Sequence, residues 1–99
     1  MENEIRAQSI LHLYQEMKVR IVDLTHSQHA IRALDFIFQF PTFTGPVFED
    51  RSQIPTPTAR RILRVLRDEG VLVSLRESAG RCPALFSFQQ LLRRAEGQF

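Results

Sequence analysis

Four arginines lie within eight residues of this chain, at Arg60, Arg61, Arg64 and Arg67. A guanidinium is a planar fork of donors that can bridge the acceptors of a guanine base or clamp a phosphate. On a helical wheel, Arg61 and Arg64 lie opposite an apolar face, and Arg60 and Arg67 lie at the edge of the charged side. The spacing therefore predicts a helix with one cationic face that could meet an anionic partner.

The segment from Thr56 to Gly70 has the signals of a complete helix. Thr56 can accept a hydrogen bond from the first turn, and the missing N–H of Pro57 costs nothing at the first helical position. Gly70 can take the left-handed conformation that closes a helix. The apolar face consists of Ala59, Ile62, Leu63 and Leu66. An ordinary surface helix with solvated charges has the same pattern, so the neighbouring elements must decide between the two interpretations.

Other residues that could do chemistry lack the partners that chemistry needs. His26 and His29 lie three apart, but no carboxylate or thiol stands beside them at metal-ligand spacing, and His12 is expected to be solvated. Cys82 is the only cysteine, which excludes an intrachain disulfide, and we expect it to be a small buried side chain. No Ser/His/Asp arrangement or carboxylate pair occurs. We therefore expect no metal, no other cofactor and no catalytic activity.

The positive charge is concentrated in one third of the chain. The 99 residues carry a net charge of +2. From Arg51 to Arg81 there are seven arginines against three acidic residues, which gives +4 there and −2 on the remainder. This asymmetry favours an anionic partner. No apolar run approaches the roughly 20 residues of a membrane span, and the acidic N-terminus is unlike a signal peptide. We expect a cytoplasmic protein with no membrane partner.

The N-terminal part predicts one long amphipathic helix, from about Asn3 to Leu24. Its apolar residues recur at alternating steps of three and four, at Ala7, Ile10, Tyr14, Met17, Ile21 and Leu24. Such a helix on a small domain is expected to leave part of this stripe for a second copy or an upstream domain. We assign to that interface Ile10, Tyr14, Met17 and Ile21. The predicted division is residues 1–26, a long amphipathic linker or dimerisation helix, and residues 27–99, the single domain, whose expected fold is given below.

Two more helices are expected before Thr56. Thr25 or Ser27 can cap the first of them, and Pro41 ends it after Phe40. Thr44 can cap a short third helix, and residues 51–55 form a tight connection into the arginine-bearing helix. The phenylalanines of this region are expected to fill the core rather than to stack on nucleobases: Phe36, Phe38, Phe40, Phe43 and Phe48.

After Gly70, residues 71–76 and 82–88 predict two strands around a turn at 77–81. Pro83 restricts the second strand to an edge role at that point, and residues 89–94 predict a short final helix. The fold class expected is mainly α with a small β-hairpin: a winged helix-turn-helix preceded by a long N-terminal helix. The helix at 57–69 would then enter the major groove of double-stranded DNA. The predicted DNA contacts are Thr56, Thr58, Arg60, Arg61, Arg64, Arg67, Arg76 and Arg81.

Within that set, Thr58, Arg61 and Arg64 are expected nearest the bases. Arg60 and Arg67 would face phosphates, and the hairpin arginines, Arg76 and Arg81, would contact the DNA backbone.

Four segments together resemble the C-terminal winged-helix region that follows the catalytic domain in many proteins of the Fic/DOC (filamentation induced by cAMP) family. They are residues 33–44, 57–61, 68–72 and 88–92, and residues 13–18 resemble the helix that joins the two regions there. The most specific piece is the Pro-Thr-Ala-Arg-Arg string at 57–61, in register with Glu69-Gly70. The resemblance implies a regulatory, DNA-binding part of a Fic-family protein.

The chain has neither the His-Pro-Phe start nor the Gly-Asn-Gly-Arg phosphate cradle of the loop with which a Fic enzyme transfers AMP. The turn at 77–81 is also less basic than the family's wing tends to be. These departures leave an alternative open. The chain could instead be a protein-interaction or dimerisation module that regulates an upstream Fic catalytic domain without binding DNA.

Overall fold

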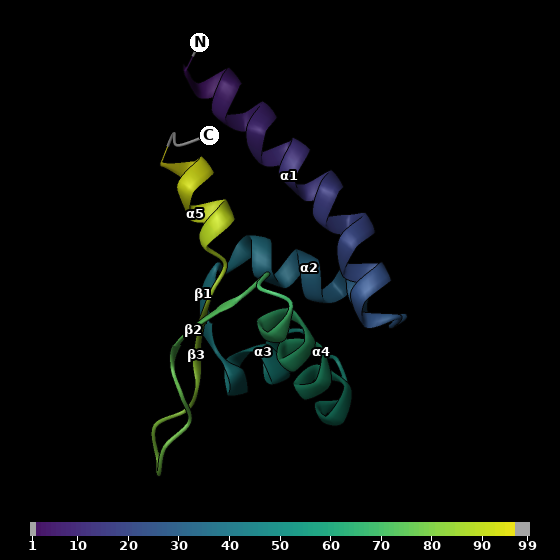
Figure 1. Ribbon diagram of the computed structural model, residues 1–99, viewed down its shortest axis with the longest axis vertical. Coiled ribbons are helices and arrows are strands. Elements are labelled where there is room, and N and C mark those ends of the chain that lie inside the picture. The colour runs from purple at the N-terminus through teal and green to yellow at the C-terminus, as the bar shows by residue number, and fades with distance from the viewer. Residues whose placement is uncertain (1, 97–99) are drawn as a thin grey trace.

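The computed structural model describes residues 2–96, and within this range the chain forms five helices and three strands (Figure 1). In chain order they are α1 (Glu2–Thr25), α2 (Ala30–Gln39), β1 (Thr42–Thr44), α3 (Gly45–Arg51), α4 (Thr56–Asp68), β2 (Val73–Arg76), β3 (Leu85–Ser87) and α5 (Gln89–Ala95). The expectation of a mainly helical chain with a small amount of β-structure is confirmed.

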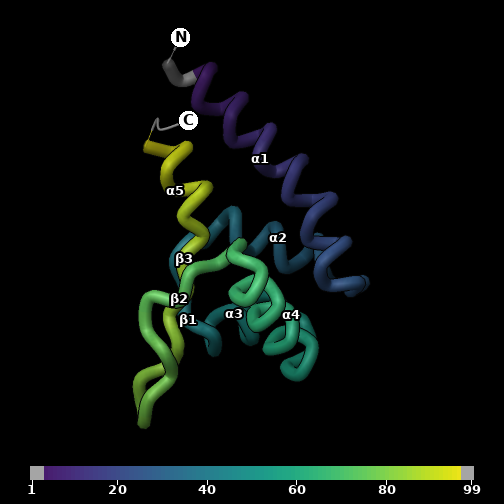
Figure 2. The backbone as a smooth tube through the Cα atoms, in the orientation of Figure 1, coloured from purple at the N-terminus to yellow at the C-terminus, as the bar shows by residue number. Residues whose placement is uncertain are grey.

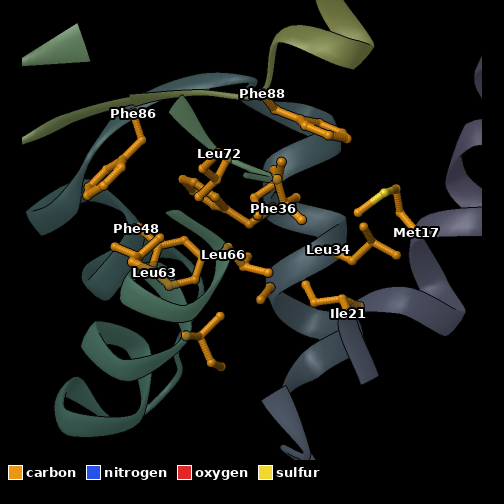
Figure 3. Packing of buried hydrophobic residues seen from close by; sticks show 14 of the residues in the cluster. Met17, Ile21, Leu34, Phe36, Phe48, Leu63, Leu66, Leu72, Phe86 and Phe88 are labelled. Carbon is orange, nitrogen blue, oxygen red and sulfur yellow. The ribbon is translucent and has the colours of Figure 1, made fainter. Parts of the chain in front are cut away.

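The apolar stripe of α1 lies against the chain's own core. Met17 and Ile21 are buried, and Figure 3 shows both side chains beside Leu34 of α2. Ile10 and Tyr14 are half-buried against the same core. This corrects the predicted partner interface, because α2 and α4 cover the stripe that was assigned to a second chain. The large apolar residues that α1 does expose, at 42–65% of their surface, are Ile5, Leu11, Val19 and Val22.

The core is one continuous cluster that joins α1, α2, α4, the sheet and α5. Phe36 stands near its centre, with its ring 5.2 Å from the rings of Phe40, Phe43 and Phe48, measured between centroids. Such tilted and edge-on arrangements are the ones that aromatic side chains favour in cores. Phe43 and Phe48 are buried, which confirms the expected packing role, whereas Phe40 is exposed.

The sheet has three antiparallel strands in the order β1-β3-β2. The sequence predicted only two strands, because β1 has three residues and follows a helix directly, which is too short for a periodic pattern. Pairing with β3, where Phe43 lies opposite Phe86, creates this strand. The second strand was predicted to have an edge role at Pro83, but β3 begins only at Leu85, after that proline, and lies in the centre of the sheet.

The turn between α3 and α4 is held by buried residues and by side-chain hydrogen bonds, one of which Arg32 Nη1 donates to the carbonyl of Gln53 at 3.3 Å. Ile54 is buried, and its N–H donates to Ser52 Oγ at 3.3 Å. Gln53 takes a left-handed conformation, with φ of 58°. Pro55 occupies the N-cap position of α4, and no side chain caps this helix end. The predicted cap, Thr56, is instead the first helical residue.

The turn between α1 and α2 also differs from the expected capping. Thr25 is the last residue of α1, and its hydroxyl donates to the carbonyl of Ile21 at 2.7 Å. Ser27 Oγ accepts a hydrogen bond from the N–H of His29 at 3.0 Å, just before α2 begins at Ala30. Of the two predicted caps, Ser27 is therefore the one that supports the entry into α2.

The final helix packs back beside the first. Figure 2 shows the backbone of α5 running alongside the N-terminal half of α1. Leu91 of α5 is buried, and Arg94 Nη1 donates to the carbonyl of Ser9 at 2.9 Å. As a result, α3, α4 and the β2–β3 hairpin stand at the end of the molecule farthest from the N-terminus (Figure 1).

Candidate nucleic-acid interface

A groove of about 390 Å³ lies between α4, the start of α3 and the β2–β3 hairpin. Arg60, Arg64 and Arg67 line it from α4. They recur at steps of four and three, which places them on one face of the helix. The apolar part of the groove consists of Pro46, Leu63, Pro83, Ala84 and Phe86. Three arginines and one acid, Glu49, leave the lining with a net charge of +2.

Arg60 forms the shortest ion pair of the groove. Its Nε donates to Glu49 Oε1 at 2.7 Å. The side chain of Arg60 is 72% exposed, whereas that of Glu49 is 20% exposed. The carboxylate therefore lies back against the protein, and the guanidinium reaches out from it.

Arg67 has acidic neighbours that are much more exposed. Its guanidinium lies 3.3 Å from Asp68 Oδ1 and 4.0 Å from Glu77 Oε2, a residue of the hairpin turn. Asp68 and Glu77 are 59% and 75% exposed. Ion pairs of this kind are screened by water and salt and contribute about 0–1 kcal/mol. Arg67 is consequently free to exchange these partners for another anion.

Arg64 is exposed on the same face of α4. Within residues 2–96 it takes part in no ion pair and no side-chain hydrogen bond. Its N–H donors are therefore available to an outside acceptor.

Arg61 is directed to a different place from the one predicted. Its Nη1 donates to the carbonyl of Thr25, at the end of α1, at 2.9 Å, and the side chain is half-buried. In return, Arg20 Nη2 of α1 donates to the carbonyl of Glu69, at the end of α4, at 3.1 Å. The last carbonyls of a helix lack intrahelical donors and carry partial negative charge, so each arginine stabilises the end of the other helix. Arg61 thus positions α4 instead of lying beside Arg64 on the open face.

The two threonines of the predicted contact set differ in exposure. Thr56 is exposed in the first turn of α4, whereas Thr58 is half-buried. Thr58 and Arg60 are two positions apart, which is roughly 200° around a helix. The structure therefore places Thr58 away from the three groove-lining arginines.

The hairpin carries the two remaining predicted contacts. Arg76 Nε donates across the hairpin to the carbonyl of Pro83 at 3.0 Å. Arg81 is exposed in the two-residue turn at the tip, beside Gly80, whose φ is 57°. Glycine at the first position of such a turn is typical of tight hairpins. Both arginines face solvent, but neither lines the groove.

The other candidate chemical groups are scattered. Cys82 is exposed, so the expectation of a buried thiol is wrong. His26 and His29 both lie in the turn between α1 and α2, outside either helix, and His12 pairs with Glu16 at 2.7 Å on the exposed side of α1. In the described part of the chain, no group of three or more His, Cys, Asp or Glu side chains could hold a metal ion.

A larger hollow of about 650 Å³ lies between α2 and the end of α3. Arg32 and Arg51 line it together with Asp35 and Asp50, so its charges balance. This hollow favours neither sign of ligand. The net positive charge of the groove beside α4 distinguishes that groove as the candidate site for an anion.

Glu49 is the main residue of the groove that the sequence did not assign to a site. It lies on α3, eleven positions from Arg60, and no short-range motif links the two. Only the packing of α3 against α4 brings them together.

No family model, curated protein or solved structure matches this chain. Of the helices within residues 2–96, none combines the length and apolar character needed to cross a bilayer.

Proposed function

We propose that this chain is a winged helix-turn-helix domain that binds double-stranded DNA through α4. The element order α2-β1-α3-α4-β2-β3 and the three-stranded antiparallel sheet support this assignment. In a helix-turn-helix protein, the second helix of the pair lies in the major groove, and here that helix is α4. The β2–β3 hairpin would be the wing.

The observation that carries the proposal is the row of Arg60, Arg64 and Arg67 along one open face of α4. DNA offers phosphates along the rim of the major groove and guanine acceptors inside it, and arginine binds both. Arg64, which has no acidic partner in the described residues, is the first candidate for a phosphate contact. Arg76 and Arg81 add positive charge on the hairpin side of the groove.

The test is binding of the purified chain to a fluorescently labelled random-sequence duplex, followed by anisotropy over a salt series. We expect the logarithm of the association constant to fall linearly with the logarithm of salt concentration, with a slope of about −0.9 for each phosphate contacted. Absence of binding at low salt would refute the proposal.

The second candidate function is a protein-interaction or dimerisation module. It is favoured by Leu11, Val19 and Val22, which α1 exposes to solvent, whereas Met17 and Ile21 are buried. Exposed apolar patches of this kind mark protein contacts when they are contiguous. Light scattering of the wild type and of a Leu11→Ser/Val19→Ser variant would test it. A dimeric wild type that the double substitution converts to a monomer would support this function. A monomeric wild type would exclude dimerisation as the function of this surface.

The assignment to the C-terminal regulatory part of a Fic-family protein is a proposal that rests on the resemblance in sequence alone. Under either candidate function, this part would act beside an upstream catalytic domain. Binding of the purified chain to a separately expressed Fic catalytic domain, measured by calorimetry, would test the association.

A further inference from the structure

Glu49 and Arg60 form a pair in which one partner is held in place and the other is presented to solvent. The exposed fractions are 20% for Glu49 and 72% for Arg60. The hydrogen bond uses Arg60 Nε, so the N–H donors of the two terminal nitrogens remain available. The guanidinium is thus fixed at its base and open at its end.

The position of Glu49 is set by the packing of α3. The preceding residue, Phe48, is fully buried in the core, and α3 packs directly on α4. The acids beside Arg67 differ in this respect, since Asp68 and Glu77 are largely exposed and Glu77 lies in the hairpin turn. Of the ion pairs of the groove, the one between Glu49 and Arg60 is therefore the one that can fix the direction of an arginine side chain.

Charge and geometry give this pair a different role from that of Arg64. A carboxylate 2.7 Å from Arg60 cancels its charge, which weakens its attraction for a phosphate. The ion pair with Glu49 does not change the direction in which the terminal nitrogens of Arg60 donate hydrogen bonds. Two parallel N–H donors match the O6 and N7 acceptors that guanine presents in the major groove. A guanidinium already held in one orientation also loses less conformational freedom on binding.

We propose that Glu49 is a positioning residue that directs Arg60 at a guanine, so that Arg60 selects the DNA sequence while Arg64 binds phosphate. This inference rests on the proposed DNA-binding function and names the base that the site prefers. It exchanges the roles expected from the sequence, in which Arg60 faced phosphate and Arg64 lay nearest the bases.

The test is selection of bound duplexes from a randomised library by the full chain and by three variants, Glu49→Gln, Arg60→Lys and Glu77→Gln. We expect the wild type to enrich a motif with one strongly preferred guanine. Lysine keeps the charge but lacks the fork, and glutamine keeps the size of Glu49 but holds Arg60 less firmly. Both Arg60→Lys and Glu49→Gln should lower the preference for that guanine over adenine by roughly 5- to 100-fold.

Glu77→Gln is the matched control, since it removes the same charge from an exposed acid of the same groove edge. It should leave the guanine preference unchanged. Affinity for random duplex at low salt should not fall in either Glu→Gln variant, because each loses one negative charge, which raises the net charge of the chain by one. A loss of base preference without a loss of this affinity is a result that a general defect in folding would not produce.

Three results would overturn the inference. An unchanged guanine preference in Glu49→Gln, or in Arg60→Lys, would refute the role of the pair and leave DNA binding intact. A motif selected by the wild type that contains no preferred guanine would also refute the role of the pair and leave DNA binding intact. A wild type that binds no duplex at low salt would refute the proposed function and this inference together.

Discussion

Arg61 of α4 donates a hydrogen bond to the carbonyl of Thr25, the last residue of α1, at 2.9 Å. The bond joins the middle of the arginine-bearing helix to the end of the longest helix, and Arg20 connects α1 to Glu69, at the end of α4, at 3.1 Å. Together these contacts fix how α4 lies on α1. The direction in which Arg60, Arg64 and Arg67 point therefore depends on an arginine that does not itself line the groove.

We expect Arg61→Ala to lower the free energy of unfolding by about 1–2 kcal/mol, because it removes a charge-assisted hydrogen bond from a half-buried site. Arg64→Ala should change that free energy by less than about 0.5 kcal/mol, since Arg64 is an exposed residue. Urea denaturation of the two variants checks the difference. Equal stabilities would contradict the positioning role of Arg61.

Arg64→Ala should instead weaken DNA binding. Loss of one phosphate contact is expected to reduce the salt slope by about 0.9 and to lower affinity uniformly across sequences. The control is Arg93→Ala, which removes the same charge from an exposed position on α5. Anisotropy titrations at several salt concentrations would measure both slopes. If the salt slope of Arg64→Ala equals that of the wild type, Arg64 does not contact a phosphate.

Gly70→Ala should destabilise the chain through the backbone alone. Gly70 follows α4 with φ of 79°, and nothing lies within 4 Å of the position that a Cβ would take. The left-handed conformation costs an alanine about 1–2 kcal/mol, and we expect a loss of that size in thermal or urea unfolding.

Gly45→Ala is the matched control for this backbone effect. An added Cβ at Gly45 would meet only Phe86 Cε2, at an ordinary contact distance of 4.0 Å, and no positive φ is involved. Its stability should be equal to that of the wild type or slightly higher. If both alanine variants lost the same stability, the loss at Gly70 could not be attributed to its conformation.

The contact between Tyr14 and Asp35 predicts a loss of stability in alkaline solution. The Tyr14 hydroxyl donates to Asp35 Oδ1 at 2.6 Å. This hydrogen bond, then burial and then the charge of Asp35 raise the pKa of Tyr14 above its ordinary value of 10.0. The unfolded chain releases the phenolic proton first, so the contribution is complete below about pH 10 and is lost as the pH rises through the folded-state pKa.

Tyr14 is the only tyrosine of the chain, so its ionisation can be followed by ultraviolet absorbance without interference from other phenols. The folded chain should titrate at higher pH than the chain in denaturant. Tyr14→Phe should lower the free energy of unfolding at pH 8 by about 0.5–1 kcal/mol and reduce its decline above pH 10. If Tyr14 titrates at the same pH in the folded chain and in denaturant, the hydrogen bond to Asp35 is absent in solution.

The sequence predicted the long helices closely. The periodic stripe at residues 3–24 and the segment from Thr56 to Gly70 correspond to α1 (Glu2–Thr25) and α4 (Thr56–Asp68). Amphipathic periodicity, proline and glycine act over a few residues, so they are visible in the order of the chain. The same local signals predicted the hairpin turn that contains Gly80.

The short strand β1 and the partners of individual side chains could be identified only from the tertiary structure. β1 exists because β3 supplies its hydrogen-bonding partner, and Met17 is buried because α2 covers it. The direction of Arg61 depends on a carbonyl 36 positions earlier in the chain. A helical wheel sorts residues into faces but does not show which element lies over each face.

The sequence by itself thus determined a cationic, amphipathic α4 and the helices around it, because these follow from local spacing. Only the tertiary structure decided which arginines share one groove and which one binds the end of α1. It also brought Glu49 to Arg60 from another helix. The physical reason is that the orientation of a long arginine side chain depends on the acceptor to which its guanidinium donates. For Arg60 and Arg61 these acceptors, Glu49 and the carbonyl of Thr25, lie on other helices.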